Sequence, residues 1–292
     1  MTMNLAAVGT TVGPITVAWK PDDALLYALG VGAGQDDSRS DLPFTTENSQ
    51  DVPQQVLPTF GAILTGFRGP ADGSARPRID SGTFDPAFLV HAEQSVGLSR
   101  PLPPSGTIEV STELVGIYDK GSGALVVTEA YGLLPGDSPE SPTVTTRSAV
   151  FIRGEGGFGV KGPSDPWFVP QRDPDLMLNA STRADQALLY RLSGDHNPLH
   201  SDPKFAARAG FPHPILHGMC TYGVVARVLL GALADGDPER FCSISGRFSK
   251  PVFPGDRLAV SVWVDDTEAR FKVTGRDGGV VLDRGTFVTR NR

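Results

Sequence analysis

One short segment of the chain brings together side chains that could exchange protons. Residues 194–200 read Gly-Asp-His-Asn-Pro-Leu-His, which puts Asp195 and His200 five residues apart. Pro198 makes the intervening segment a turn, because it lacks a backbone N–H and disfavours the α region for the residue before it. A carboxylate and an imidazole that converge in such a turn could bind one water molecule and move its protons. The apolar neighbour Leu199 would lower the local dielectric and help to tune both pKa values.

The helix expected after this segment offers a further participant. Residues 212–218 read Pro-His-Pro-Ile-Leu-His-Gly and lead into an apolar stretch at 218–234. The first N–H groups of a helix have no internal partners and carry the positive end of its dipole. They could therefore stabilise a carbonyl oxygen that becomes negatively charged. Gly218 has no side chain to obstruct the approach of a ligand to this backbone.

The same residues also allow plainer interpretations. Asp195 could merely cap a turn. His196 and His213 have the character of solvated loop residues, and His217 would orient the start of the helix rather than react. None of these side chains, nor His200, has a recognised zinc-ligand spacing, so neither a metal nor another cofactor is predicted.

The elements that must position these residues occur twice. Two pairs of similar segments keep the same order along the chain: DDALLYAL (22–29) with DQALLYRL (185–192), and SRPLPP (99–104) with SKPVFP (249–254). Such ordered self-similarity indicates a tandem duplication. The proline-rich stretch 162–174 is typical of a linker. We therefore expect one domain at 1–165 and a second at 170–292.

Each half is expected to begin with a short amphipathic helix, at 21–29 and at 182–192. Alternation of apolar and polar residues predicts strands at 107–118, 123–133, 143–153, 242–249, 256–265, 269–276 and 280–289. Apolar residues cover most of the circumference of the helix at 218–234, which should be buried. The first half has a weaker helical counterpart, around 59–68 and 85–98, whose interruption would leave room for a ligand. The pattern predicts an α+β fold with antiparallel sheets wrapped around a central helix.

Composition excludes several classes of protein. The net charge of −7 argues against a nucleic-acid partner. The two cysteines, Cys220 and Cys242, are expected to be reduced packing thiols. No apolar run is long enough to span a membrane, no basic residue precedes the first apolar stretch as in a secretory signal, and residues 290–292 are no peroxisomal address. We expect a cytoplasmic protein.

Residues 190–220, YRLSGDHNPLHSDPKFAARAGFPHPILHGMC, strongly resemble the hydratase 2 motif of MaoC-like proteins. The resemblance to type 2 enoyl-CoA hydratases, a unit that eukaryotes carry in peroxisomal multifunctional enzyme type 2, covers nearly the whole chain. It is carried by YALGVGA (27–33), LPTFG (57–61), HAEQ (91–94), RPLP (100–103), DKGSG (119–123) and RFSKPVFPG (247–255). It implies a double hot-dog fold, in which a first domain with a reduced helix shapes the acyl-CoA site of a catalytic second domain.

The resemblance also implies an activity, the reversible syn addition of water to a trans-2-enoyl-CoA to give a (3R)-3-hydroxyacyl-CoA. Asp195 and His200 would form the catalytic dyad, with no assignment of which is base and which is acid. Asn197 would orient the loop and the substrate, and the Gly218 N–H would polarise the thioester carbonyl.

The residues that the resemblance places against the acyl-CoA are His91, Ala92, Lys120, His196, Pro198, Leu199 and Phe248. Ala92 is a departure, because relatives often have glycine there, and a required positive φ would strain it. The first half has Gly30-Val31-Gly32 where the second has Ser193-Gly194-Asp195, so one active site per chain is expected.

Other functions stay open from the sequence. The chain could be a (3R)-hydroxyacyl dehydratase of fatty-acid or lipid elongation, acting on CoA or carrier-protein substrates. It could be a hot-dog thioesterase, or a non-catalytic acyl-CoA-binding subunit. A homodimer is expected, because hot-dog sheets commonly pair edge to edge, whereas the acyl chain length and the pathway are left open.

Overall fold

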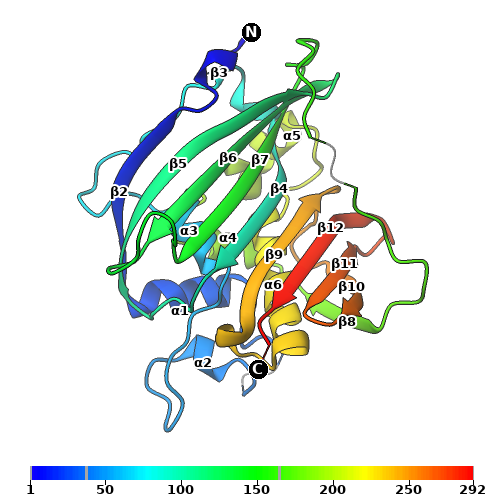
Figure 1. The fold of residues 1–292 in the computed structure, drawn as a ribbon. Helices are drawn as coiled ribbons and strands as arrows, with labels where there is room; N and C mark the ends of the chain where they lie inside the picture. The colour runs from blue at the N-terminus through cyan, green and yellow to red at the C-terminus, as the bar shows by residue number, and fades with distance from the viewer. Residues whose placement is uncertain (1, 37–38, 164–165, 292) are drawn as a thin grey trace.

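The computed structural model describes residues 2–36, 39–163 and 166–291. The strands of its large sheet are, from the first half, β2 (Thr11–Trp19), β4 (Leu89–Leu98), β5 (Gly106–Asp119), β6 (Gly123–Leu133) and β7 (Val144–Arg153), and from the second, β8 (Leu176–Ser181), β9 (Phe241–Phe248), β10 (Arg257–Asp265), β11 (Glu268–Thr274) and β12 (Val280–Thr289). Their order in the ten-stranded antiparallel sheet is β2-β5-β6-β7-β4-β9-β12-β11-β10-β8 (Figure 1). A separate two-stranded sheet pairs β1 (Thr2–Met3) with β3 (Gly82–Thr83).

The described helices are mostly short. They are α1 (Pro21–Gly30), α2 (Leu42–Thr45), α3 (Phe60–Gly66), α4 (Gln186–Tyr190), α5 (Pro203–Arg208) and α6 (Gly218–Ala234), with 3-10 turns η1 (Leu5–Ala7), η2 (Pro86–Phe88), η3 (Arg191–Ser193), η4 (Pro198–His200) and η5 (Pro238–Arg240). The longest, α6, is 17 residues long and buries apolar side chains on most of its surface.

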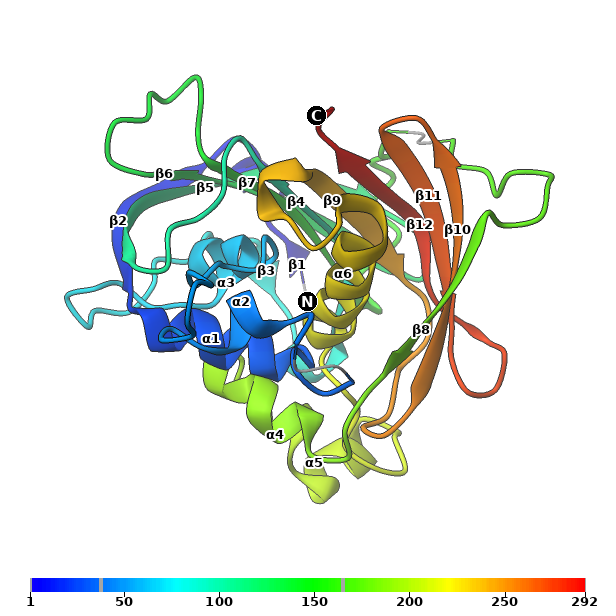
Figure 2. The same cartoon turned by 90° about the horizontal axis from the view of Figure 1, so that it is seen from below.

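Each half of the sheet curves around one central helix (Figure 2). The strands β4 to β7 lie against α3, and β8, β9 and β12 lie against α6. Because α3 has 7 residues, the first half has the reduced helix that the sequence indicated. The predicted α+β double hot-dog fold is confirmed.

The two halves join at a seam between β4 and β9. Residues from Glu93 to Gly97 pair with residues from Arg247 to Ser243 in antiparallel register, which makes the sheet continuous. The predicted domain boundary lies between residues 165 and 170, of which Asp165 lies outside the described residues. The division at 165 to 170 therefore stays a prediction.

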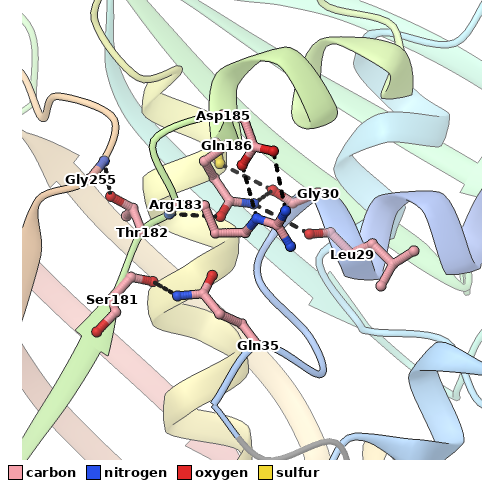
Figure 3. Close-up of polar contacts among 10 residues, drawn as sticks. Leu29, Gly30, Gln35, Ser181, Thr182, Arg183, Asp185, Gln186 and Gly255 are labelled. Atoms are coloured by element: carbon pink, nitrogen blue, oxygen red, sulfur yellow. Dashed lines mark hydrogen bonds and ion pairs between the residues drawn. The ribbon is translucent and has the colours of Figure 1, made fainter.

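A second contact between the halves lies where α1 ends beside the start of α4 (Figure 3). The buried side chain of Gln186 donates to the carbonyl oxygens of Leu29 and Gly30 and accepts from the N–H of Arg183. The Cys220 thiol donates to the same Gly30 carbonyl. These bonds satisfy carbonyl groups at the end of α1 that have no partner within the helix.

Most of the predicted elements are confirmed. All strands predicted from alternation are present with their ends within two residues, and α6 spans the predicted 218–234. The helix expected at 182–192 is shorter and runs from α4 into η3.

The helical assignment of 85–98 was wrong, because this segment forms η2 followed by β4. Side-chain burial along the end of β4 alternates at Gln94, Val96 and Leu98, which is the period of a strand. Two edge strands were not predicted. In β2 the pair Gly13-Pro14 and a register shift interrupt the alternation, and β8 has only six residues.

Within the described ranges, we find no helix with the length and apolar character needed to cross a membrane.

Candidate active site

A cavity of 710 Å³ is lined by residues of both halves. The first half contributes side chains from α3 and from strands β4 to β7. The second half contributes Asp195, Asn197, Leu199 and His200, the start of α6 and the end of β9. A cavity of this size can hold much of a small organic ligand.

Asp195 and His200 converge at this cavity. A carboxylate oxygen of Asp195 and a ring nitrogen of His200 lie within 4.8 Å of each other. His200 Nδ1 lies 2.9 Å from the carbonyl oxygen of Ile215, which can only accept, so Nδ1 carries the proton and Nε2 keeps a lone pair. Burial lowers the pKa of His200, although the hydrogen bond to Ile215 and the charge of Asp195 partly oppose this effect. His200 is therefore a neutral base at neutral pH.

Hydrogen bonds from backbone N–H groups to side-chain oxygens within the loop hold the segment that carries Asp195. The Asn197 N–H donates to Asp195 Oδ1, and Asn197 Oδ1 accepts from the N–H of Leu199 at the start of η4. Gly194 has φ 128°, and a Cβ there would lie 3.1 Å from the carbonyl oxygen of Phe67 at the end of α3. Glycine is required at this position, since the loop packs directly on the backbone of the first half.

A short helix, α5, follows the loop. Asp202 caps α5 by accepting hydrogen bonds from the N–H groups of Lys204 and Phe205. Gly210 follows the helix with φ 86°, as expected for a residue at a helix end. This helix braces the segment between η4 and α6.

His217 lies behind the dyad, immediately before α6, and its side chain is buried. Its Nε2 lies 3.2 Å from the backbone carbonyl oxygen of Asp195, so Nε2 carries a proton and donates it. The ring stacks on that of His200, with centroids 3.8 Å apart and planes inclined at 29°. Burial, followed by the proximity of His200, lowers the pKa of His217 to about 3.

Asp195, His200 and His217 also offer ligand atoms within 4.8 Å of one another, close enough for a metal ion. Each imidazole donates one N–H to a carbonyl and keeps a lone pair on its other ring nitrogen, and the two rings are stacked. A tetrahedral zinc site needs lone pairs that converge on one point, with ligand atoms about 3.4 Å apart. The absence of a metal stays a prediction.

Gly218 begins α6 at the wall of the cavity. A Cβ on Gly218 would lie 3.3 Å from the ring of Phe248, so the glycine leaves space between this ring and the helix start. The N–H groups of the first turn have no partner within the helix and can bind a ligand oxygen. Phe248 also lies against the edge of His91, with ring centroids 5.1 Å apart.

A bulge in β4 turns His91 and Gln94 toward the cavity. The pairing of β4 with β7 shifts register between His91 and Glu93, so the lining residues are three positions apart rather than two. His91 Nε2 lies 3.1 Å from both the Glu93 carbonyl oxygen and Ser148 Oγ, and Ser148 Oγ donates to Gln94 Oε1. Burial lowers the pKa of His91. Sequence reasoning missed Gln94 and Ser148, although Gln94 lies in the HAEQ segment.

The structure does not bring every predicted residue to the cavity. His91, Leu199 and Phe248 line it, as do the predicted catalytic residues Asp195, Asn197, His200 and Gly218. Ala92, Lys120, His196 and Pro198 are not among the lining residues.

These four residues differ in setting. Lys120 is exposed in the turn between β5 and β6, and His196 and Pro198 are exposed in the loop. Ala92 lies at the bulge and is not among the residues with positive φ, so the predicted strain is absent. Their contacts with a substrate stay predictions.

A helix wrapped by an antiparallel sheet in each half, with a carboxylate and an imidazole beside the start of the second helix, defines a double hot-dog protein with an acid–base site. Comparison with known proteins agrees. Residues 168–283 match the family model of the MaoC like domain, and residues 18–154 match that of the MFE-2 hydratase 2 N-terminal domain.

Two proteins of Mycobacterium tuberculosis are similar along almost their whole length. The chain is 46% identical to 3-hydroxyacyl-thioester dehydratase Y, with 98% of each chain covered. It is 40% identical to enoyl-CoA hydratase ChsH3, with 94% of this chain and 95% of the relative covered. The crystal structure of a MaoC-like dehydratase from Phytophthora capsici superposes with a TM-score of 0.85 at 34% identity, covering 99% of this chain and 98% of the other. The chain belongs to the MaoC-like family of type 2 enoyl-CoA hydratases.

Proposed function

We propose that the chain is an (R)-specific enoyl-CoA hydratase, which adds water reversibly to a trans-2-enoyl-CoA to give a (3R)-3-hydroxyacyl-CoA. The observation that carries this proposal is the gap between Asp195 and His200. Their polar atoms lie within 4.8 Å of each other without a direct hydrogen bond. At ordinary hydrogen-bond lengths the two partners of one water molecule lie up to about 4.5–5 Å apart, so groups this close can both hydrogen-bond to one water.

The proposed reaction uses the tautomer of His200 described above. As the water oxygen bonds to C3 of the substrate, one water proton moves to His200 Nε2 and negative charge develops on the thioester oxygen. The N–H of Gly218 stabilises this oxygen. The imidazolium then gives its proton to C2, while Asp195 orients the water and balances the transient positive charge. Both additions occur on the face that the dyad covers, which makes the addition syn.

Cationic side chains support a CoA thioester as the substrate. Arg78, Arg153 and Lys250 line the cavity and are exposed, although the chain has a net charge of −7. Such side chains can bind the phosphate groups of CoA as they enter.

The experiment that tests the function is a hydration assay over enoyl-CoAs of graded length, with chiral analysis of the product. We expect turnover and a (3R)-3-hydroxyacyl-CoA. A (3S) product, release of free CoA thiol, or tight binding without turnover would contradict the proposal. The last two outcomes would indicate a thioesterase and a binding subunit, respectively.

The dehydratase is a second candidate function, because the relative with 46% identity is named a 3-hydroxyacyl-thioester dehydratase. It is the same reaction in the opposite direction, so the site serves both. Relative rates on CoA and carrier-protein thioesters would separate the two functions.

We also propose the domain division at 1–165 and 170–292, a homodimer and a cytoplasmic location. The division is supported by the two family matches, whose ranges do not overlap. Sedimentation of the full chain would test the dimer.

A further inference from the structure

His217 is an unusual choice for a buried position. Its Nε2 donates to the Asp195 carbonyl, so Nδ1 keeps a lone pair, and this buried atom has no hydrogen-bond partner among the described residues. An unsatisfied buried acceptor disfavours the folded state. An apolar side chain would therefore serve packing better than histidine does.

The first half has an equivalent pair of positions that lies beside no catalytic dyad. Tyr27 and Tyr190 hold equivalent positions in the repeated segments DDALLYAL and DQALLYRL. The Tyr27 hydroxyl donates to Thr59 Oγ1 at 2.8 Å, and Thr59 immediately precedes α3. In the second half, the Tyr190 ring lies 4.9 Å from His217, which immediately precedes α6, and the Tyr190 hydroxyl has no partner within the described part of the chain. The first half thus pairs its tyrosine hydroxyl with a hydrogen-bond partner. The second half, beside the dyad, has a ring contact in its place and leaves the hydroxyl unpaired among the described residues.

The His217 side chain touches both members of the dyad. Its N–H holds the backbone of Asp195, and its ring face supports the ring of His200, whose Nδ1 must stay directed at Ile215. A histidine supplies a flat ring and a single directed donor in one side chain. Leucine would supply neither, phenylalanine only the ring, and glutamine only the donor.

We propose that His217 is a positioning residue, which holds the carboxylate of Asp195 and the lone pair of His200 in one geometry for proton transfer. This proposal rests on the proposed function, because the dyad defines what is positioned. His217 itself exchanges no proton with the substrate.

The test uses His217→Leu, His217→Phe and His217→Gln in the full chain, with His213→Leu, an exposed histidine outside the cavity, as the matched control. We expect His217→Leu to lower kcat for enoyl-CoA hydration about 10- to 100-fold, because small displacements of reacting groups slow catalysis strongly. KM should change less than about threefold, and Tm should change little, because the unpaired Nδ1 is removed together with the donor to the Asp195 carbonyl. The Phe and Gln variants should each recover part of the loss. A kcat for His217→Leu within about twofold of the wild type, or losses that follow Tm in all three variants, would overturn the proposal.

Two further measurements isolate the positioning. In the Asp195→Asn background, His217→Leu should lower kcat by much less than in the wild type, because both changes act through one unit; equal effects would contradict the proposal. The ¹⁵N chemical shifts of His200, assigned with a His200→Gln variant, should report the Nδ1–H tautomer in the wild type and a mixture in His217→Leu. Unchanged His200 signals would overturn the proposal even if no hydratase activity were found. A changed tautomer in a chain without hydratase activity would contradict only the proposed function.

Discussion

The side chain of Gln186 donates a hydrogen bond to the carbonyl oxygen of Gly30, across the contact between the two halves of the chain. Its counterpart in the repeat is Asp23, which accepts from the N–H of Lys20 as Gln186 accepts from that of Arg183. The carboxylate has no hydrogens to donate. Glutamine at this position of the second copy therefore keeps the bond to a backbone N–H three residues earlier and adds a hydrogen bond to the other half.

Replacing Gln186 with leucine is expected to destabilise the fold by about 1–3 kcal/mol, because the Gly30 carbonyl loses its amide donor and keeps only the weaker Cys220 thiol, and the Arg183 N–H loses its acceptor. Urea unfolding would measure the change. The control is Gln54→Leu, which removes one bond to the Pro21 carbonyl at a half-buried site and should have a smaller effect. Equal losses in the free energy of unfolding of both variants would contradict the larger contribution expected of Gln186.

The dyad gives the most direct prediction on activity. Asp195→Asn and His200→Ala should each lower kcat for crotonyl-CoA hydration by about 10²- to 10⁴-fold, because the first removes the charge that orients the water and balances the imidazolium and the second removes the base. Circular dichroism should show a retained fold, and His213→Ala should keep near wild-type activity. Near wild-type hydration by Asp195→Asn would remove the dyad assignment.

Three histidines with lowered pKa values make stability depend on pH. The pKa values of His91, His200 and His217 all lie below the ordinary value of 6.5 in the folded chain, that of His217 at about 3. Below pH 6.5 the unfolded chain binds protons that the folded chain does not, so the free energy of unfolding should fall as pH decreases toward 3. Denaturant unfolding at a series of pH values would test this. His217→Phe should reduce the slope, and an equal slope would contradict the pKa of His217.

The lowered pKa of His200 should also determine how activity depends on pH. Since the proposed base is neutral His200, the acid limb of kcat/KM should lie below pH 6.5. An acid limb of kcat/KM at a pH well above 6.5 would show that a group other than His200 is titrating.

Gly218 should be sensitive to a single methyl group. A Cβ there would lie 3.3 Å from the ring of Phe248, so Gly218→Ala would press this ring and narrow the approach to the helix start. We expect kcat/KM to fall about tenfold, which corresponds to about 1.4 kcal/mol of transition-state stabilisation. Gly231→Ala is the control on the same helix, where a Cβ meets no atom within 4 Å and alanine should stabilise by up to about 1 kcal/mol. Similar values of kcat/KM in Gly218→Ala and Gly231→Ala would contradict the role of Gly218 at the helix start.

The sequence predicted the long strands and α6 because each has a strong period of its own. It failed for β4, where the bulge at Ala92 breaks the alternation and the apolar residues can be read as a helix. Sequence reasoning placed Asp195, His200 and Gly218 correctly at one cavity, since a turn and a helix start fix them locally. Ser148 and Gln94 could not be paired in advance, because strand register brings them together from distant parts of the chain.

The seam between β4 and β9 has a consequence for assembly. It joins two half-sheets that both contribute walls to one cavity. Because one polypeptide connects them, their encounter is intramolecular, with an effective concentration set by the linker rather than by the amount of protein. The cavity therefore stays complete at any dilution at which the chain remains folded, and each half is free to diverge without having to recognise copies of itself.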